Sequence, residues 1–262
     1  MSIAIELKGV SVKLGDTVVA DGVNLSIAPG EFVCLLGPSG CGKSTLLNVI
    51  AGFVQAQGTV LAGGVPITGP GKERGVVFQS SEALFPWLTV RQNVEYAARI
   101  RGVSRSERTE KADKYLRMVG LSSAANRFPS ELSGGMRQRA QIARVLANEP
   151  SVILMDEPFG ALDAQTREVL QIELERIWRE TGASVLFVTH DIGESILLAD
   201  RVVTMTVGPK ARIKSIAEVD LSRPRQLASS RAIELLRTLR DDIAVEVNKV
   251  LTAQGLVLGG RA

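Results

Sequence analysis

The 262-residue sequence lacks the features of several common protein classes. No uninterrupted apolar run approaches the ~18 residues of a membrane span, so we expect that the chain does not cross a membrane by itself. The first residues, Met1–Lys8, carry charges where a signal peptide needs an apolar core. There is also no long block of like charge, and 31 basic residues nearly balance 28 acidic ones. A nucleic-acid partner is therefore not expected.

Cysteine is scarce as well. The two cysteines, Cys34 and Cys41, lie in a short apolar run and in the glycine-rich segment that follows it. A disulfide between them would distort both segments. We therefore expect free thiols in a reducing compartment, and we assign neither cysteine a catalytic role.

The glycine-rich segment lies between an apolar strand, 31–36, and a helix that ends near Gly52. This order is the context that a G-x-x-x-x-G-K-[ST] motif requires, and it argues against an incidental glycine-rich turn. The glycines let successive N–H groups point at one anion, and the helix start adds its positive dipole end. Lys43 supplies charge for the β- and γ-phosphates, and the Ser44 hydroxyl is placed to ligate Mg²⁺. The sequence predicts a nucleoside triphosphate site made of Gly37, Pro38, Ser39, Gly40, Cys41, Gly42, Lys43, Ser44 and Thr45.

Hydrophobic patterning predicts two kinds of sheet. Alternating apolar residues within 3–27 predict an antiparallel hairpin, 3–19, followed by a further strand, 23–27. Continuous apolar runs at 151–157 and 184–189 instead predict strands of a parallel sheet that is covered on both faces.

The predicted elements divide the chain into parts. Residues 1–79 and 150–207 form an α/β core that includes the antiparallel β part, and residues 80–149 form an inserted helical subdomain. Together they make one domain, 1–207. Residues 208–262 form a short C-terminal extension, in which apolar residues from Ile233 to Val250 fit one amphipathic helix.

Polar residues end three predicted core strands: Gln79, the pair Asp156 and Glu157, and His190. In an open parallel sheet, ligands bind beyond the carboxyl ends of the strands. A buried strand that runs into two unpaired carboxylates is costly, and a bound Mg²⁺-nucleotide removes that cost. We predict that Ser44, Gln79 and Asp156 hold Mg²⁺. Glu157 is then the general base for the water that attacks the γ-phosphate.

His190 is the only histidine of the chain. A lone histidine more often lies at the surface or in the core without a chemical role. Its position after the strand 185–189, at the same sheet edge as Asp156, favours a contact with the γ-phosphate and the attacking water. His190 and Glu157 are therefore the predicted catalytic residues.

A second anion site is predicted at the segment Leu132–Met136. Ser133 as N-cap, followed by Gly134 and Gly135, exposes N–H groups at the start of a helix. An ordinary capped helix is the alternative, and the segment alone does not decide between the two.

These motifs, in this order, make the sequence resemble the nucleotide-binding subunits of ATP-binding-cassette (ABC) transporters. The resemblance covers residues 3–207 and includes GPSGCGKST at 37–45, Gln79, LSGGM at 132–136, VILMDE at 152–157, ALD at 161–163, and His190. It implies an α/β P-loop NTPase (RecA-like) core with an N-terminal antiparallel β subdomain and an inserted α-helical subdomain. It also implies ATP and Mg²⁺ as cofactors.

The resemblance further implies a head-to-tail homodimer. Each ATP would lie between the phosphate loop of one subunit and Ser133, Gly134 and Gly135 of the other, with Asp163 at the seam. Two residues depart from the family pattern. Met136 replaces a more usual glutamine, as in a variant found among bacterial importers. Leu14 stands where members usually carry an aromatic that stacks on adenine, a contact worth about 1–3 kcal/mol in comparable cases.

The segments 69–79, 84–90 and 158–163 look like those of the nitrate, sulfonate and taurine importers. This implies an ATPase subunit at the cytoplasmic face of the inner membrane, with permease subunits and, indirectly, a periplasmic solute-binding protein as partners. An importer ATPase for another small solute stays open. A cassette ATPase of DNA repair or translation would generally need coiled-coil insertions or tandem cassettes. A binding module without turnover is disfavoured by Glu157 and His190.

Large apolar residues cluster in the predicted loop 80–88, directly after Gln79. Exposed aromatics beside a proline are costly on a monomer surface but expected in a docking site. We predict that Phe85 and Trp87 form part of the groove for a cytoplasmic helix of the permease. The alternative is that both residues pack into the core of the helical subdomain.

Overall fold

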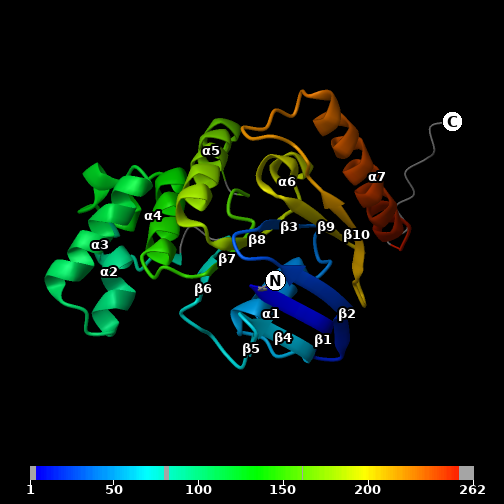
Figure 1. Ribbon diagram of the computed structural model, residues 1–262, viewed down its shortest axis with the longest axis horizontal. Coiled ribbons are helices and arrows are strands. Elements are labelled where there is room, and N and C mark those ends of the chain that lie inside the picture. The colour runs from blue at the N-terminus through cyan, green and yellow to red at the C-terminus, as the bar shows by residue number, and fades with distance from the viewer. Residues whose placement is uncertain (1–3, 80–82, 161, 254–262) are drawn as a thin grey trace. The chain divides into compact units, whose positions relative to one another are not determined.

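The computed structural model describes residues 4–79, 83–160 and 162–253 (Figure 1). The chain forms two compact units. Unit 1 comprises residues 1–70 and 186–262, and unit 2 comprises residues 71–185. The chain passes from unit 2 to unit 1 inside strand β8 (Ser184–Thr189), whose residues are all buried.

The antiparallel sheet of unit 1 has the strand order β2-β1-β4-β5. Its strands are β1 (Ile5–Leu14), β2 (Thr17–Ile27), β4 (Gln57–Ala62) and β5 (Val65–Pro66). The predicted antiparallel sheet is confirmed. The prediction of a separate strand at 23–27 is wrong, because β2 runs unbroken from Thr17 to Ile27. Irregularities in its pairing with β1 let the strand change register without ending.

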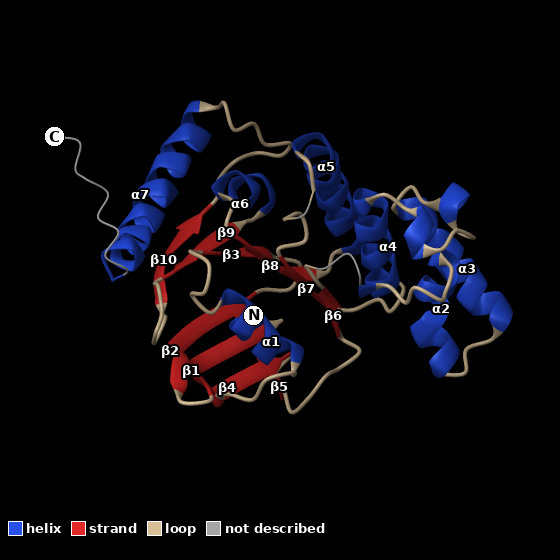
Figure 2. Cartoon of the chain, turned by 180° about the vertical axis from the view of Figure 1, so that it is seen from behind, coloured by secondary structure: helices blue, strands red, loops and turns tan. Residues whose placement is uncertain are grey.

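The second sheet of unit 1 contains β3 (Phe32–Leu36), β9 (Arg201–Met205) and β10 (Ile213–Glu218), in the order β10-β9-β3-β8. β3 pairs with β9 in parallel, and β10 pairs with β9 antiparallel. Helix α6 (Ile192–Leu198) packs against β3, and α7 (Ser230–Ala253) packs against β9. Helix α1 (Lys43–Ala51) packs against β1 and β4, so it lies between the antiparallel sheet and β3 (Figure 2).

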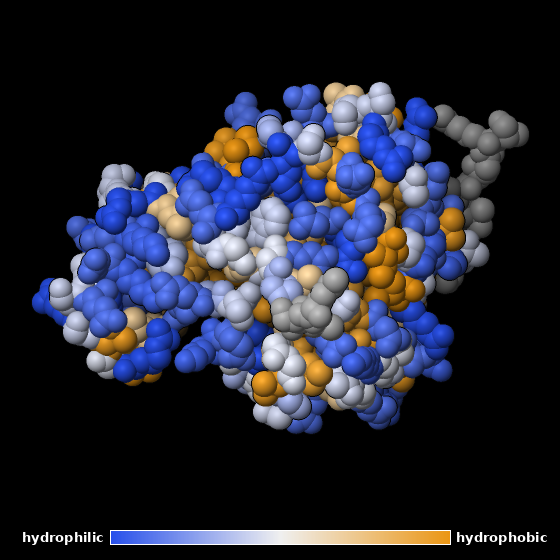
Figure 3. Space-filling model, in the orientation of Figure 1, coloured by the Kyte–Doolittle hydropathy of each residue, from blue (hydrophilic) through white to orange (hydrophobic). Residues whose placement is uncertain are grey.

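Unit 2 contains the parallel strands β6 (Arg74–Val77) and β7 (Val152–Asp156) and four helices among its described residues. The helices are α2 (Val90–Ile100), α3 (Arg105–Met118), α4 (Gly134–Leu146) and α5 (Ala164–Thr181). Short 3-10 turns lie at Ser122–Ala124 and Pro129–Glu131. Helices α2, α3 and α4 pack on one another, which confirms the predicted helical region. In Figure 3 the visible face over α3 is mainly hydrophilic, as its charged sequence requires.

The predicted C-terminal helix is present as α7, and Leu239 of its apolar residues is fully buried, but the buried face also includes a carboxylate that was not predicted. Ile233 is 40% exposed, whereas Glu246 is only 1% exposed. The Glu246 carboxylate accepts hydrogen bonds from Val207 N at 3.0 Å and Lys249 Nζ at 2.7 Å, and Lys214 Nζ lies 3.3 Å away. Hydrophobic periodicity cannot detect a carboxylate that is buried because it is paired. Among the described residues, no helix combines the length and apolarity needed to span a membrane.

Candidate nucleotide site

The glycine-rich loop of unit 1 connects β3 to α1, as predicted. Gly42 is the N-cap of α1 at φ 93°, and a Cβ there would lie 3.0 Å from Val19 Cγ1, so this position requires glycine. No side chain caps the start of the helix. The Lys43 side chain is 4% exposed, and its ammonium donates to the carbonyls of Gly37 (2.8 Å) and Pro38 (3.0 Å). The loop therefore combines a helix N-terminus with a held cation, which suits a polyphosphate.

Both cysteines of unit 1 are buried free thiols, as predicted. Burial raises the pKa of Cys41, against the opposing charge of Lys43. Burial also raises the pKa of Cys34, and the charge of Glu194 raises it further while Lys43 opposes. Buried thiols with raised pKa values are poor nucleophiles.

His190 lies exposed in the turn between β8 and α6. The next residue, Asp191, is the N-cap of α6, and its Oδ1 accepts from Glu194 N at 3.0 Å. Thr189 and Glu194, on either side of this turn, are buried and hydrogen-bonded to each other at 2.6 Å. Sequence reasoning missed these neighbours of His190. The Asp-x-x-Glu spacing at 191–194 could have signalled the cap.

Unit 2 carries Gln79, Asp156 and Glu157. In the parallel pairing of β6 with β7, Val77 lies opposite Met155, so Gln79 and Glu157 follow at the same ends of adjacent strands. A Cβ at Gly160 would lie 3.7 Å from Glu157 Oε2 and 3.8 Å from Gln79 Nε2. The structure therefore brings the carboxylate and the amide to one place within this unit.

Glu157 has an unusual backbone conformation. Its φ is 41°, in the left-handed region that few non-glycine residues occupy. Asp156, the last residue of β7, keeps ordinary strand geometry and is half-buried. Such strain persists only where the surroundings over-determine it, and it concentrates at functional sites. The strained conformation therefore marks Glu157 as a candidate functional residue.

The predicted Mg²⁺ ligands are Ser44 in unit 1 and Gln79 and Asp156 in unit 2. Within the described part of the chain, no three His, Cys, Asp or Glu side chains group as a metal site. A set with a hydroxyl, an amide oxygen and a single carboxylate nevertheless suits Mg²⁺, which is usually bound through one or two carboxylates together with substrate phosphates.

The segment 132–136 opens α4 of unit 2. Ser133 is its N-cap and accepts from Met136 N at 3.3 Å. A Cβ at Gly135 would lie 2.6 Å from Thr166 Cγ2, so close packing on α5 excludes a side chain there. A Cβ at Gly134 would meet only Leu162 at 3.6 Å, an ordinary contact. Packing within the chain therefore explains Gly135 but not Gly134.

Asp163 is exposed and caps α5, with its Oδ1 accepting from Thr166 N at 3.0 Å. This hydrogen bond is the main reason why the pKa of the Asp163 carboxyl lies below its ordinary value. Asp163 therefore has a structural role in its own chain, whatever it does at a dimer seam. Ala161, the first residue of the predicted ALD segment, lies outside the described residues.

The aromatic segment after Gln79 begins with Ser80–Glu82, which lie outside the described residues. Trp87 is 70% exposed and therefore does not belong to the helical core. Phe85 is half-buried, with its ring centroid 4.4 Å from that of Tyr96 and the Arg144 guanidinium 5.6 Å above it.

Asn93 of α2 organises this loop and was not foreseen from the sequence. It is fully buried, and its Nδ2 donates to the carbonyls of Phe85, Leu88 and Thr89 at 3.0–3.1 Å. Its Oδ1 accepts from Phe85 N at 2.8 Å. The exposed Trp87 is therefore presented on a loop that one buried amide holds.

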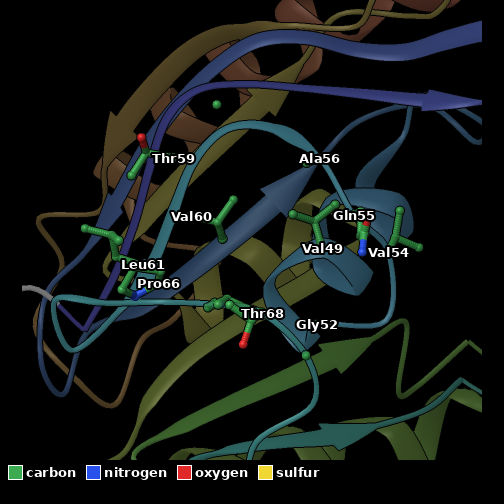
Figure 4. A pocket seen from close by; sticks show the side chains of 13 residues that line it. Val49, Gly52, Val54, Gln55, Ala56, Thr59, Val60, Leu61, Pro66 and Thr68 are labelled. Carbon is green, nitrogen blue, oxygen red and sulfur yellow. The ribbon is translucent and has the colours of Figure 1, made fainter.

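A cavity of about 470 Å³ lies elsewhere in unit 1, between the end of α1 and the β4–β5 hairpin (Figure 4). Its lining includes Val49, Val60, Leu61 and Pro66. The described residues that line it include no charged side chain and none of the predicted site residues. The cavity is therefore distinct from the phosphate loop, and it lacks the cations that a nucleotide needs.

The strand–loop–helix geometry at Lys43 and the strand-end carboxylates define a nucleoside-triphosphate-binding protein of the phosphate-loop class. Residues 20–160 match the family described as ABC transporter. A taurine import ATP-binding protein of Chromobacterium violaceum is 51% identical over 215 residues, or 82% of each chain. A nitrate import ATP-binding protein of Synechococcus elongatus is 49% identical over 215 residues, or 81% of this chain and 78% of the relative.

A solved ATP-binding cassette, a dimer in a post-hydrolysis state bound to ADP and phosphate, is 33% identical. It superimposes with a TM-score of 0.69 and covers 82% of this chain and 98% of that one. The chain belongs to the ABC transporter family and is an ATPase. The predicted P-loop NTPase core with an antiparallel β subdomain and a helical insert is thereby confirmed.

Proposed function

We propose that this chain is the ATP-binding and ATP-hydrolysing subunit of an importer for a small anion or sulfonate, of the nitrate, sulfonate and taurine type. The observation that carries the proposal is the similarity, over about four fifths of the chain, to proteins named for taurine and nitrate import. The subunit works at the cytoplasmic face of the membrane with permease subunits. An importer ATPase for another small solute and a non-transport cassette ATPase are the alternatives.

In this proposal the loop amides and Lys43 bind the phosphates of ATP. Glu157 accepts a proton from the water that attacks the γ-phosphorus, while the bond from that phosphorus to the ADP oxygen breaks. His190 contacts the γ-phosphate and the attacking water. Ser44, Gln79 and Asp156 would hold Mg²⁺, which neutralises phosphate charge when bound. The strained backbone of Glu157 and the proximity of Gln79 to its carboxylate support these roles.

The subunit would act as a homodimer, with Ser133, Gly134 and Gly135 completing the site of the partner and Asp163 at the seam. Support comes from the relative solved as a dimer. It also comes from Gly134, since intramolecular packing gives no reason for a glycine at this position.

The permease would dock beside Phe85 and Trp87. A large aromatic side chain that is 70% exposed, on a loop held by the four hydrogen bonds of Asn93, resembles the rigid anchor of an interface. Because the loop follows Gln79 directly, a movement of Gln79 during hydrolysis could move the docked helix with it.

The test of catalysis compares Glu157→Gln with Lys43→Ala. Glu157→Gln should bind ATP, lose hydrolysis by about 10²–10⁴-fold, and accumulate as an ATP-bound dimer in size-exclusion chromatography. Lys43→Ala should instead weaken ATP binding in calorimetry. Glu168→Gln, at an exposed position of α5, is the matched control and should hydrolyse ATP normally. Hydrolysis by Glu157→Gln at near wild-type rate would mean that Glu157 is not the base.

The test of the solute class is uptake of labelled nitrate, taurine and an alkanesulfonate by cells that lack this gene. We expect that uptake of one of these solutes is lost, and that the wild-type gene restores it while the Glu157→Gln gene does not. Unchanged uptake of all three solutes would refute the proposed class. Retained ATPase activity of the purified chain would then favour an importer for another solute.

A further inference from the structure

The turn that carries His190 rests on a buried carboxylate. Glu194 is only 6% exposed, and a buried carboxylate is costly unless it is hydrogen-bonded. Its Oε2 accepts from the hydroxyl of Thr189 at 2.6 Å, and Thr189 is itself 2% exposed. This contact joins the last residue of β8 to the first turn of α6, across His190.

Two further hydrogen bonds close a ring around His190. The Thr189 hydroxyl accepts from Asp191 N at 3.0 Å, and Asp191 Oδ1 accepts from Glu194 N at 3.0 Å. The residues immediately before and after His190 are therefore both held through Glu194. His190 itself remains exposed at the centre of the turn.

The base of this ring is rigid. Every residue of β8 is buried, so the side on which Thr189 lies has little freedom. The other end of α6 is held by Arg225, whose side chain is 3% exposed and donates to the carbonyls of Ile196 at 2.9 Å and Val219 at 3.1 Å. Both ends of the short helix are held, and the ring fixes the chain on either side of His190.

We propose that Thr189 and Glu194 are positioning residues for catalysis, which hold the imidazole of His190 where it meets the γ-phosphate and the attacking water. The inference rests on the catalytic role proposed for His190. Displacement of a catalytic group by about 1 Å can cost on the order of 10²-fold in rate, so loss of the ring should lower kcat. ATP binding depends on the phosphate loop and should be preserved.

The experiment replaces one hydroxyl in the full chain. Thr189→Val keeps the shape of the side chain but removes the donor to Glu194, and should lower kcat about tenfold or more with the KM for ATP within about twofold. Thr189→Ser restores the hydroxyl and should recover most of the activity. Thr204→Val is the matched control. Its buried hydroxyl lies in the same unit but bonds to Ser215, so kcat should stay within about twofold.

Nuclear magnetic resonance of the His190 imidazole distinguishes a change in its position from a general loss of stability. Because the chain contains one histidine, its imidazole signals need no assignment. In Thr189→Val these signals should shift and narrow toward those of a free histidine, while in Thr204→Val they should remain at the wild-type positions.

Asp191→Ala, which removes the other bond of the ring, is the second variant and carries the test if Thr189→Val does not fold. A normal kcat in either folded variant would refute positioning through His190. So would a fall in kcat caused by Thr189→Val that is as large in the His190→Ala background as in the wild type. Full hydrolysis by His190→Ala would instead refute the proposed role of His190 itself. Loss of activity in His190→Ala with normal activity in Thr189→Val would refute the inference alone.

Discussion

The buried carboxylate of Glu246 should make a measurable contribution to the stability of unit 1. It attaches α7 to the segment after β9, through Val207 N, and, together with Asp242, to β10, through Lys214. Glu246→Ala removes the acceptor of Val207 N–H and one of the partners of the Lys214 ammonium, which keeps its hydrogen bond to the Asp242 carbonyl at 2.6 Å. The substitution also keeps helix propensity high, so the effect reports the contacts and not the helix itself.

The magnitude follows from these contacts. A hydrogen bond to a charged group contributes about 1.5–3 kcal/mol, and the substitution removes those from Val207 and Lys214. Lys249 also donates to Glu246, but it is 56% exposed, so water screens part of its contribution. We expect Glu246→Ala to lower the free energy of unfolding by about 3 kcal/mol. That corresponds to a fall in Tm of roughly 6–12 °C for a domain of this size.

Thermal unfolding followed by circular dichroism measures this difference. Glu234→Ala is the control on the same helix, because Glu234 is exposed and forms an ion pair with the exposed Arg231 one turn away. The control should stay within about 0.5 kcal/mol of wild type. If Glu246→Ala lost no more stability than Glu234→Ala, the attachment of α7 would not depend on this carboxylate.

The pH dependence gives a second check. Burial raises the pKa of Glu246, but the hydrogen bonds from Lys249, Val207 and Lys214 outweigh it and hold the pKa below 4.5. A carboxyl group with a lowered folded-state pKa contributes its stability above the unfolded value and loses it as the pH falls through the folded one. The difference between wild type and Glu246→Ala should therefore be full above about pH 4.5 and shrink in more acidic solution.

Three further outcomes are expected. Leu14, which is 47% exposed at the end of β1, offers no aromatic face to adenine, so GTP should compete with ATP better than in Leu14→Tyr; equal selectivity would refute this. Gly135→Ala should destabilise the isolated subunit by about 1–3 kcal/mol through the clash with Thr166, whereas Gly134→Ala should unfold normally but hydrolyse ATP slowly; normal turnover would exclude a role in trans. Trp87→Ala should fold and bind ATP yet fail in transporter assembly or uptake, and normal uptake by the folded variant would contradict docking there. Asn93→Ala should show the same defect and, in addition, a lower Tm.

The sequence alone predicted the features of this protein that depend on residues close together in the chain. The phosphate loop requires glycines and a lysine between a strand and a helix, and these are contiguous residues, so the motif and its structure coincide. Ser133 and Asp163 are N-caps that accept a hydrogen bond from the backbone N–H three residues on, and Ser133 was predicted as such. The continuous apolar runs at 151–157 and 184–189 likewise predicted the strands β7 and β8, because a strand that is buried on both faces needs apolar residues throughout.

Pairings between distant residues were decided only by the tertiary structure. The sequence indicated that α7 is a helix, but its buried face depends on Glu246 meeting Val207 and Lys214, which no periodicity shows. It indicated that Trp87 follows Gln79, but the loop owes its form to the amide of Asn93. A motif specifies which groups are present, and contacts remote in sequence decide which buried polar groups are satisfied and where the groups point.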